Sequence, residues 1–137
     1  MEGGLYVSKD MKAFMDAFCF GPCDLLSISK GNDTLYLSLK DSANRHAHAM
    51  YRGCVYWRLP EHQIDTHFSF VQRVSAAELL AHPNSITIYE LKKNANNVAD
   101  LLHEWEHSGL SFFIHLGNQI NSEYLVVARS LEYSEDE

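Results

Sequence analysis

The stretch that decides the fold is DLLSISKGNDTLYLSLK, residues 24–40. Leu26 and Ile28 alternate with serines before Gly31-Asn32-Asp33, and leucines at every second position follow this cluster. Alternation with a period of two is typical of a strand that is buried on one face, and a Gly/Asn/Asp cluster between two such runs is typical of a turn. The stretch therefore predicts an antiparallel β-hairpin.

Further strands are expected after this hairpin. One long strand should cover residues 45–59, with Gly53 as a β-bulge, and Pro60 should end it. A half-solvated strand should follow over 64–74, because apolar and polar residues alternate there. Together with the hairpin, these strands form a four-strand meander. Three more strands are predicted over residues 86–91, 111–116 and 124–131.

Three helices complete the prediction. Met and Phe side chains with the spacing i, i+3, i+4, i+7 indicate an amphipathic helix near 9–20. A capping box at 75–78 opens a short helix that stops before Pro83. The last helix begins after 94–97 and is ended by Gly109. The predicted fold class is α+β: a mostly antiparallel sheet, with the four-strand meander plus further strands, covered by two or three helices.

Composition limits the classes of protein to which the chain can belong. Hydrophobic residues make up 46% of the 137 residues, enough for one folded domain over 1–131. Eighteen acidic against eleven basic residues give a charge of −7, and the last residues, 132–137, form an acidic C-terminal tail. This balance disfavours nucleic acid as a ligand, and no apolar run predicts a membrane span. The acidic N-terminus and the odd number of cysteines, three, predict a cytoplasmic protein without a disulfide framework.

One short motif names a reaction: residues 103–107 read HEWEH, which has the form H-E-x-x-H. On a helix, His103 and His107 share a face and can bind one Zn²⁺, and Glu104 can act as the general base on the metal-bound water. A hydrolytic zinc site also needs a third protein ligand. His115 is the nearest candidate for that ligand, and Asp100 is the other.

The helix around this motif favours a different interpretation. At 100° per residue, Val98, Leu102 and Trp105 cluster on the side opposite to both histidines, so the histidines should face solvent. They also lie in the last turns of a short helix, where imidazolium is stabilised by the helix dipole. We therefore expect no cofactor, and we keep a zinc-dependent hydrolase as the alternative.

A second group of residues indicates binding rather than catalysis. Tyr51, Tyr56, Trp57 and Arg58 are close together in the predicted 45–59 strand, and these residue types are over-represented at binding hot spots. Alternation places Tyr51 and Trp57 on one face of that strand and the other two on the opposite face. We interpret the four residues as candidate anchors for a protein partner.

The function predicted from the sequence is that of a small, acidic, cytoplasmic, non-enzymatic protein-binding module. Its partner should be a protein, and a basic one could be steered by the acidic C-terminus. In size, acidity and α+β character the chain resembles bacterial immunity and antitoxin proteins and small secretion chaperones. This is a resemblance of composition, and it implies neither an oligomeric state nor a particular partner.

Overall fold

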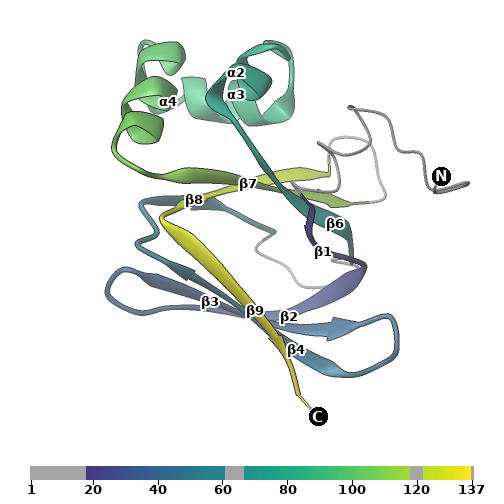
Figure 1. Ribbon diagram of the computed structural model, residues 1–137. Coiled ribbons are helices and arrows are strands. Elements are labelled where there is room, and N and C mark those ends of the chain that lie inside the picture. Colours follow the sequence, from purple (N-terminus) through teal and green to yellow (C-terminus); the bar gives the residue numbers. More distant parts are fainter. Residues whose placement is uncertain (1–17, 61–66, 118–121, 137) are drawn as a thin grey trace, which may run out of the picture.

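The computed structural model of the chain describes residues 18–60, 67–117 and 122–136. Within these ranges one antiparallel sheet of nine strands carries three short helices (Figure 1). The strands, in chain order, are β1 Phe18–Phe20, β2 Cys23–Lys30, β3 Thr34–Asp41, β4 His46–Arg52, β5 Tyr56–Arg58, β6 His67–Val74, β7 Ser111–Gly117, β8 Glu123–Ala128 and β9 Ser130–Glu135. The helices are α2 Ala76–Leu80, α3 Ile86–Lys92 and α4 Val98–His107.

The sheet is strongly bent, which its topology requires. The strand order is β5-β8-β7-β6-β2-β3-β4-β9, with β1 added beside β6, so β8 and β9 follow each other in sequence but lie far apart in the sheet. Figure 1 shows two layers of strands, with the helices above the upper one. We call β5–β8 the covered half and β2, β3, β4 and β9 the open half. Among the described residues, the two halves are joined by one short strand pairing, in which Cys23 and Asp24 of β2 pair with Phe68 and His67 of β6.

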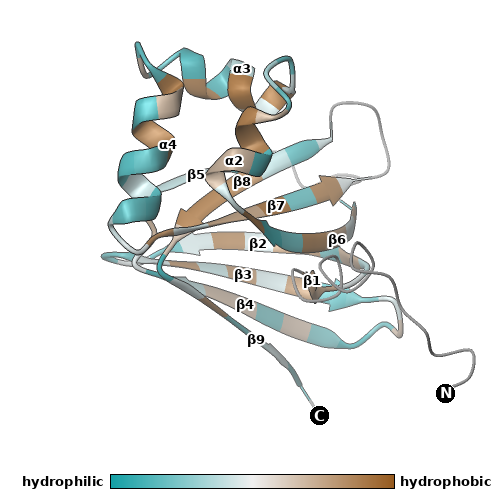
Figure 2. Cartoon of the chain, turned by 45° about the horizontal axis from the view of Figure 1, so that its top comes forward, coloured by the Kyte–Doolittle hydropathy of each residue, from teal (hydrophilic) through white to brown (hydrophobic). Residues whose placement is uncertain are grey.

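Two hydrophobic cores result from this arrangement. The first lies between the two halves of the sheet, where the ring of Phe20 stacks on that of Tyr133 at 4.6 Å between centroids. The second lies between the covered half and the helices, around Leu102 and Phe112. Strands β7 and β8 contribute to both cores and are therefore apolar on both faces, whereas the open half leaves one face to solvent (Figure 2).

The hairpin and the two capped helices are confirmed. Strands β2 and β3 pair around residues 31–33, with a bulge at Leu26 that turns this side chain outward. The capping box holds, because the Ser75 hydroxyl accepts a hydrogen bond from the Glu78 amide at 3.1 Å and the Glu78 carboxylate accepts one from the Ser75 amide at 2.9 Å. Helix α4 ends at His107, and Gly109, two residues later, has a φ of +89° that allows the Leu110 amide to reach the Trp105 carbonyl at 3.1 Å.

The predicted α+β class is wrong, because the fold is dominated by its sheet. Strands take 51% and helices 20% of the described residues, and these helices cover one half of the sheet only. The 86–91 segment, predicted as a strand, is helix α3: the Ser85 hydroxyl caps it, and the buried Thr87, Ile88 and Leu91 follow helical spacing. The helix predicted near 9–20 lies outside the described residues, except for 18–20, which form β1.

The four-strand meander is also wrong, and Gly53 is the reason. Gly53 adopts the left-handed φ of +64°, and the chain turns there instead of continuing as one strand. The amide of Cys54 then donates to the Asp33 carbonyl at 2.7 Å, and β5 pairs with β8. Only β2, β3 and β4 form a meander. Strand β6 pairs with β2 and β7, and the strand predicted over 124–131 is interrupted at Arg129.

Residues 132–135, part of the predicted acidic tail, belong to β9, which pairs with β4 along its whole length. No helix in the described ranges combines the length and the apolar content needed to cross a membrane.

Candidate functional site

The edge of the covered half carries a group of exposed aromatic and apolar side chains. Strand β5 ends the strand order, and β8 is its only partner among the described strands. Val55 and Trp57 are 55% and 38% exposed, and Tyr89 on α3, a helix that packs against β8, is 55% exposed. We call Val55, Tyr56, Trp57 and Tyr89 the aromatic edge. The Val55 amide donates to the Val127 carbonyl at 2.9 Å, which fixes the start of this edge on the sheet.

Charged groups of both signs lie beside Tyr89, at one end of the aromatic edge. The Lys93 ammonium lies 5.1 Å from the centre of the Tyr89 ring and 3.2 Å from a carboxylate oxygen of Glu90. Tyr56 is half-buried, with its ring 5.8 Å from that of Trp105. Burial raises the pKa of the Tyr56 hydroxyl, so this group stays a neutral hydrogen-bond donor. The edge therefore offers apolar contact area with a polar border.

Arg58 and Tyr51, which the sequence suggested as anchors beside Tyr56 and Trp57, make contacts within the chain. The Arg58 guanidinium donates to the Glu123 carbonyl oxygen and lies 5.0 Å from the centre of the Tyr124 ring. Tyr51 is fully buried in the first core. The turn at Gly53 separates it from Trp57, so the two side chains do not share an exposed face.

The charged and histidine side chains of the HEWEH motif lie on the solvent side of α4. His103, Glu104 and His107 are exposed, while Trp105 packs against the second core. The expected third ligand, His115, is fully buried on the opposite side of the covered half, in the first core. No group of three His, Cys, Asp or Glu residues in the described part of the chain is arranged to hold a metal ion.

His115 instead forms a buried pair with Tyr51. The Tyr51 hydroxyl lies 2.6 Å from His115 Nε2, and His115 Nδ1 has no hydrogen-bond partner among the described residues. Burial lowers the pKa of His115 to about 3, so the ring is neutral at ordinary pH. With Nδ1 carrying the proton, Nε2 can accept from the tyrosine hydroxyl. The pair is a polar contact inside an aromatic core, distant from the helix face of His103 and His107.

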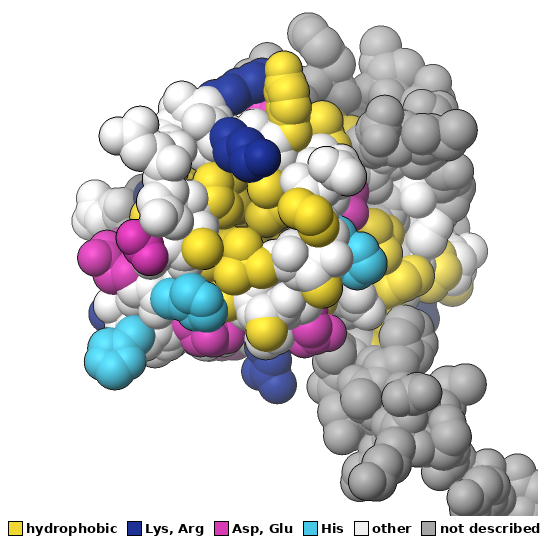
Figure 3. Space-filling view, turned by 90° about the horizontal axis from the view of Figure 1, so that it is seen from above, with side chains coloured by type: hydrophobic (Ala, Val, Ile, Leu, Met, Phe, Trp, Pro, Cys, Tyr) yellow, Lys and Arg dark blue, Asp and Glu magenta, His cyan; other side chains and the backbone are white. Residues whose placement is uncertain are grey.

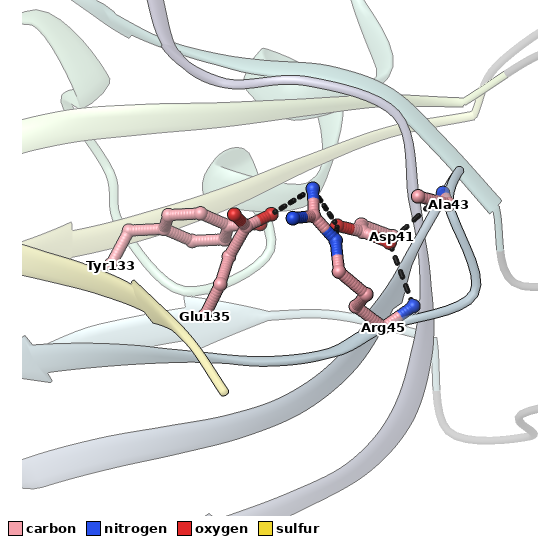
Figure 4. Close-up of polar contacts among 5 residues, drawn as sticks. All are labelled: Asp41, Ala43, Arg45, Tyr133 and Glu135. Atoms are coloured by element: carbon pink, nitrogen blue, oxygen red, sulfur yellow. Dashed lines mark hydrogen bonds and ion pairs between the residues drawn. The ribbon is translucent and has the colours of Figure 1, made fainter. Parts of the chain in front are cut away.

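The acidic C-terminal residues are paired with basic groups of the chain itself. Figure 4 shows Arg45 between two carboxylates, 3.1 Å from Asp41 and 3.5 Å from Glu135, with the Tyr133 hydroxyl donating to Glu135. The amides of Arg45 and Ala43 also donate to Asp41, each at 2.9 Å. The hydrogen bond from the Arg45 amide is the main cause that lowers the pKa of Asp41.

Two more pairs fasten β9 to β4 in the same way. Arg52 Nε lies 2.8 Å from Glu132, and His48 Nε2 lies 3.1 Å from Asp136. The sequence suggested that the acidic C-terminus steers a basic partner, and the structure gives Glu132, Glu135 and Asp136 a basic neighbour on β4 or directly before it, while Glu137 lies outside the described residues. His46 and His48, which share the solvent face of β4, belong to this charged surface.

The helical face carries a further apolar surface. Figure 3 shows hydrophobic side chains in a hollow between the helices, with charged and histidine side chains around it. The hollow has a volume of about 490 Å³ and an apolar floor that includes Leu80, Ile88 and Val98. Asn97, at its border, already caps α4 by accepting a hydrogen bond from the Asp100 amide at 3.0 Å. Lys92 and Asn96 line the same hollow.

Two members of the aromatic edge, Val55 and Tyr89, were not singled out from the sequence. Tyr89 was assigned to a strand, and the Ser85 cap three residues before Ile88 is the signal that would have placed it on a helix. The exposure of Val55 depends on β5 being an edge strand, which no local pattern reveals. No protein-family model, curated protein or solved structure matches this chain.

Proposed function

We propose that this chain is a non-enzymatic protein-binding module and that its partner contacts the aromatic edge. One observation carries the proposal: of the six large hydrophobic side chains that the described residues expose, Trp57 lies on β5 and Val55 directly before it, and a third, Tyr89, lies on α3, the helix that packs against the neighbouring strand β8. Single exposed apolar residues are normal on any protein, but a group of them indicates an interaction site. Tyr and Trp are also the residue types that most often supply binding energy at interfaces.

The edge position of β5 supports an extended partner segment. An unpaired strand edge presents backbone N–H and C=O groups that another chain can bind by adding a strand. Val55 and Trp57 are two residues apart, so they project from the same face and can contact alternate side chains of such a segment. The charged border contains both Lys93 and Glu90 and does not require a basic partner. We therefore propose a partner segment that is extended and apolar.

The state of the cysteines supports the cytoplasmic location that the sequence suggested. Cys23 and Cys54 are buried and form no disulfide. Free thiols persist in reducing compartments, whereas small exported domains of this size often rely on disulfides.

A pair of matched variants tests the proposed surface. Trp57→Asp should abolish capture of the partner from the native host, because it places a charge in the centre of the apolar contact. Tyr36→Asp is the control, since Tyr36 is 44% exposed but lies on the open half. The proposal requires a protein that is retained by the wild type and by Tyr36→Asp, is lost with Trp57→Asp, and forms a photo-crosslink from position 55. If no protein shows this pattern, or if Tyr36→Asp loses the same protein, the aromatic edge is not the binding site.

A further inference from the structure

A second groove gathers two arginines that form no ion pair with a carboxylate of the described residues. The groove has a volume of about 360 Å³ and lies where β6 and β7 face β9, at an opening of the first core. Arg73 at the end of β6 and Arg129 at the corner between β8 and β9 both line it. We call it the arginine groove.

The charges of this groove differ from those of the rest of the chain. Of the five arginines, Arg45 and Arg52 contact carboxylates, and Arg58 contacts a carbonyl oxygen and a tyrosine ring. Arg73 and Arg129 are the two that form no ion pair with any described carboxylate, and no described Asp or Glu lines the groove. In a chain with a net charge of −7, this is a local concentration of positive charge. Such a groove attracts anions.

Hydroxyl groups and aromatic rings also line the groove. Ser111 and Ser130 line it together with the two arginines, and the rings of Phe113 and Tyr133 form part of its wall. Arg129 donates one hydrogen bond, to the Ser108 carbonyl at the end of α4 at 3.4 Å. This contact positions the guanidinium and leaves most of its five N–H groups free. Planar guanidinium groups with several free donors match the oxygens of phosphates and carboxylates.

From these observations we propose that the arginine groove binds a small organic anion, with its phosphate or carboxylate group held by Arg73, Arg129 and the two serine hydroxyls. The organic part of the ligand packs on Phe113 and Tyr133. The volume suits a compact ligand, because pockets for small molecules begin at about 300 Å³. This site lies on strands other than β5, and it does not depend on the proposed protein-binding function.

The experiment is a calorimetric titration of the full chain with phenyl phosphate, benzoate and inorganic phosphate. We expect saturable binding of one phenyl phosphate per chain, weaker binding of inorganic phosphate, which lacks the apolar part, and weaker binding of benzoate, which has fewer oxygens and less charge. Arg73→Gln and Arg129→Gln should each lower the affinity for phenyl phosphate by about tenfold or more, because each removes charge-assisted hydrogen bonds. Arg73→Lys should lose part of the affinity for phenyl phosphate, since it keeps the positive charge but not the planar guanidinium with its paired N–H donors.

The control is Arg52→Gln, which removes an equal charge from the outer face of the open half. It should leave the affinity unchanged. Circular dichroism of each variant confirms that it is folded, and if Arg129→Gln is not, the two Arg73 variants alone decide the test. An absence of saturable binding to all three anions would overturn the proposal. An equal loss in Arg52→Gln would overturn it as well, because the attraction would then depend on overall charge and not on the groove.

Discussion

The covered and open halves of the sheet use strands of similar length in different environments. In the covered half, β7 and β8 have the helices on one face and the other half of the sheet on the opposite face, and their central residues are buried without alternation. In the open half, β3 and β4 alternate: Leu35, Leu37 and Leu39 are buried while Tyr36 is exposed. The covered half is therefore packed against a hydrophobic core on both faces. The open half has a core on one face and charge pairs such as Arg52–Glu132 on its solvent face.

This difference explains where candidate sites occur. The outer face of the open half is occupied by pairs such as Arg52–Glu132, which leave few groups free for a ligand. The aromatic edge and the arginine groove lie instead at boundaries, one at the edge of the covered half and the other where the two halves separate. Edges and openings are the places where side chains of a packed sheet remain accessible.

The largest expected effect is a loss of folding stability when a buried aromatic residue of the covered half is removed, compared with an exposed one of the open half. Phe112→Ala should lower the free energy of unfolding by about 3–5 kcal/mol, because this ring is buried between β7 and the helices and its removal leaves a cavity. Tyr36→Ala, at a site 44% exposed, should cost less than about 1 kcal/mol. Urea unfolding of the two variants measures both values. Equal losses would show that the two halves do not differ in burial.

The second effect is the pH dependence of stability that arises from His115, which is buried with Tyr51 between the two halves. The pKa of His115 is lowered to about 3 from 6.5, so below pH 6.5 the unfolded chain takes up a proton that the folded chain does not. Stability therefore falls as the pH decreases from 6.5 towards 3, and at pH 4.5 the loss from this residue should be about 3 kcal/mol. Replacing both partners, with His115→Leu and Tyr51→Phe, should remove this part of the pH dependence.

Urea unfolding at pH 7 and pH 4.5 tests the assignment to His115. The exposed His103 serves as the control, because His103→Leu should retain the wild-type difference between the two pH values. The double variant should lose less stability on acidification than either the wild type or the control. If all three proteins respond equally, His115 is not responsible for the pH dependence.

The same comparison shows how much of the molecule could be predicted from its sequence. In the open half, alternation over 24–40 predicts the hairpin directly, because one solvated face leaves a period of two in the sequence. The capping residues Ser75 and Gly109 likewise predict helix ends from local chemistry. These features depend on residues close together in the chain.

Features that depend on distant pairing could not be predicted. The apolar run at 86–91 fits a buried strand or a helix, and only its packing on β8 and α4 decides between them. The turn at Gly53 resembles a bulge until the partner of β5 is known. For the same reason alternation predicts Tyr51 as a surface anchor beside Trp57, and nothing in the sequence brings together Arg73 and Arg129, which are far apart in the chain.

The smallest expected effect lies in the charge network of the open half. The pKa of the Asp41 carboxyl is lowered from 3.8, first by the hydrogen bond from the Arg45 amide and also by the guanidinium of Arg45. Its contribution to stability is therefore present above pH 3.8 and is lost as the pH falls through the lower folded value. We expect a ¹³C NMR titration of the wild type to place the Asp41 midpoint below 3.8.

Arg45→Gln separates the effect of the Arg45 amide on the pKa of Asp41 from that of the Arg45 guanidinium, because it keeps the amide and removes the guanidinium. The Asp41 midpoint should rise in this variant but stay below 3.8, since the amides of Arg45 and Ala43 still donate to the carboxylate. Hydrogen exchange of the β9 amides should become faster at the same time, because Glu135 loses its contact with Arg45. A midpoint that is unchanged by the substitution would mean that solvent screens the ion pair completely and that the guanidinium does not contribute to the lowered pKa of Asp41.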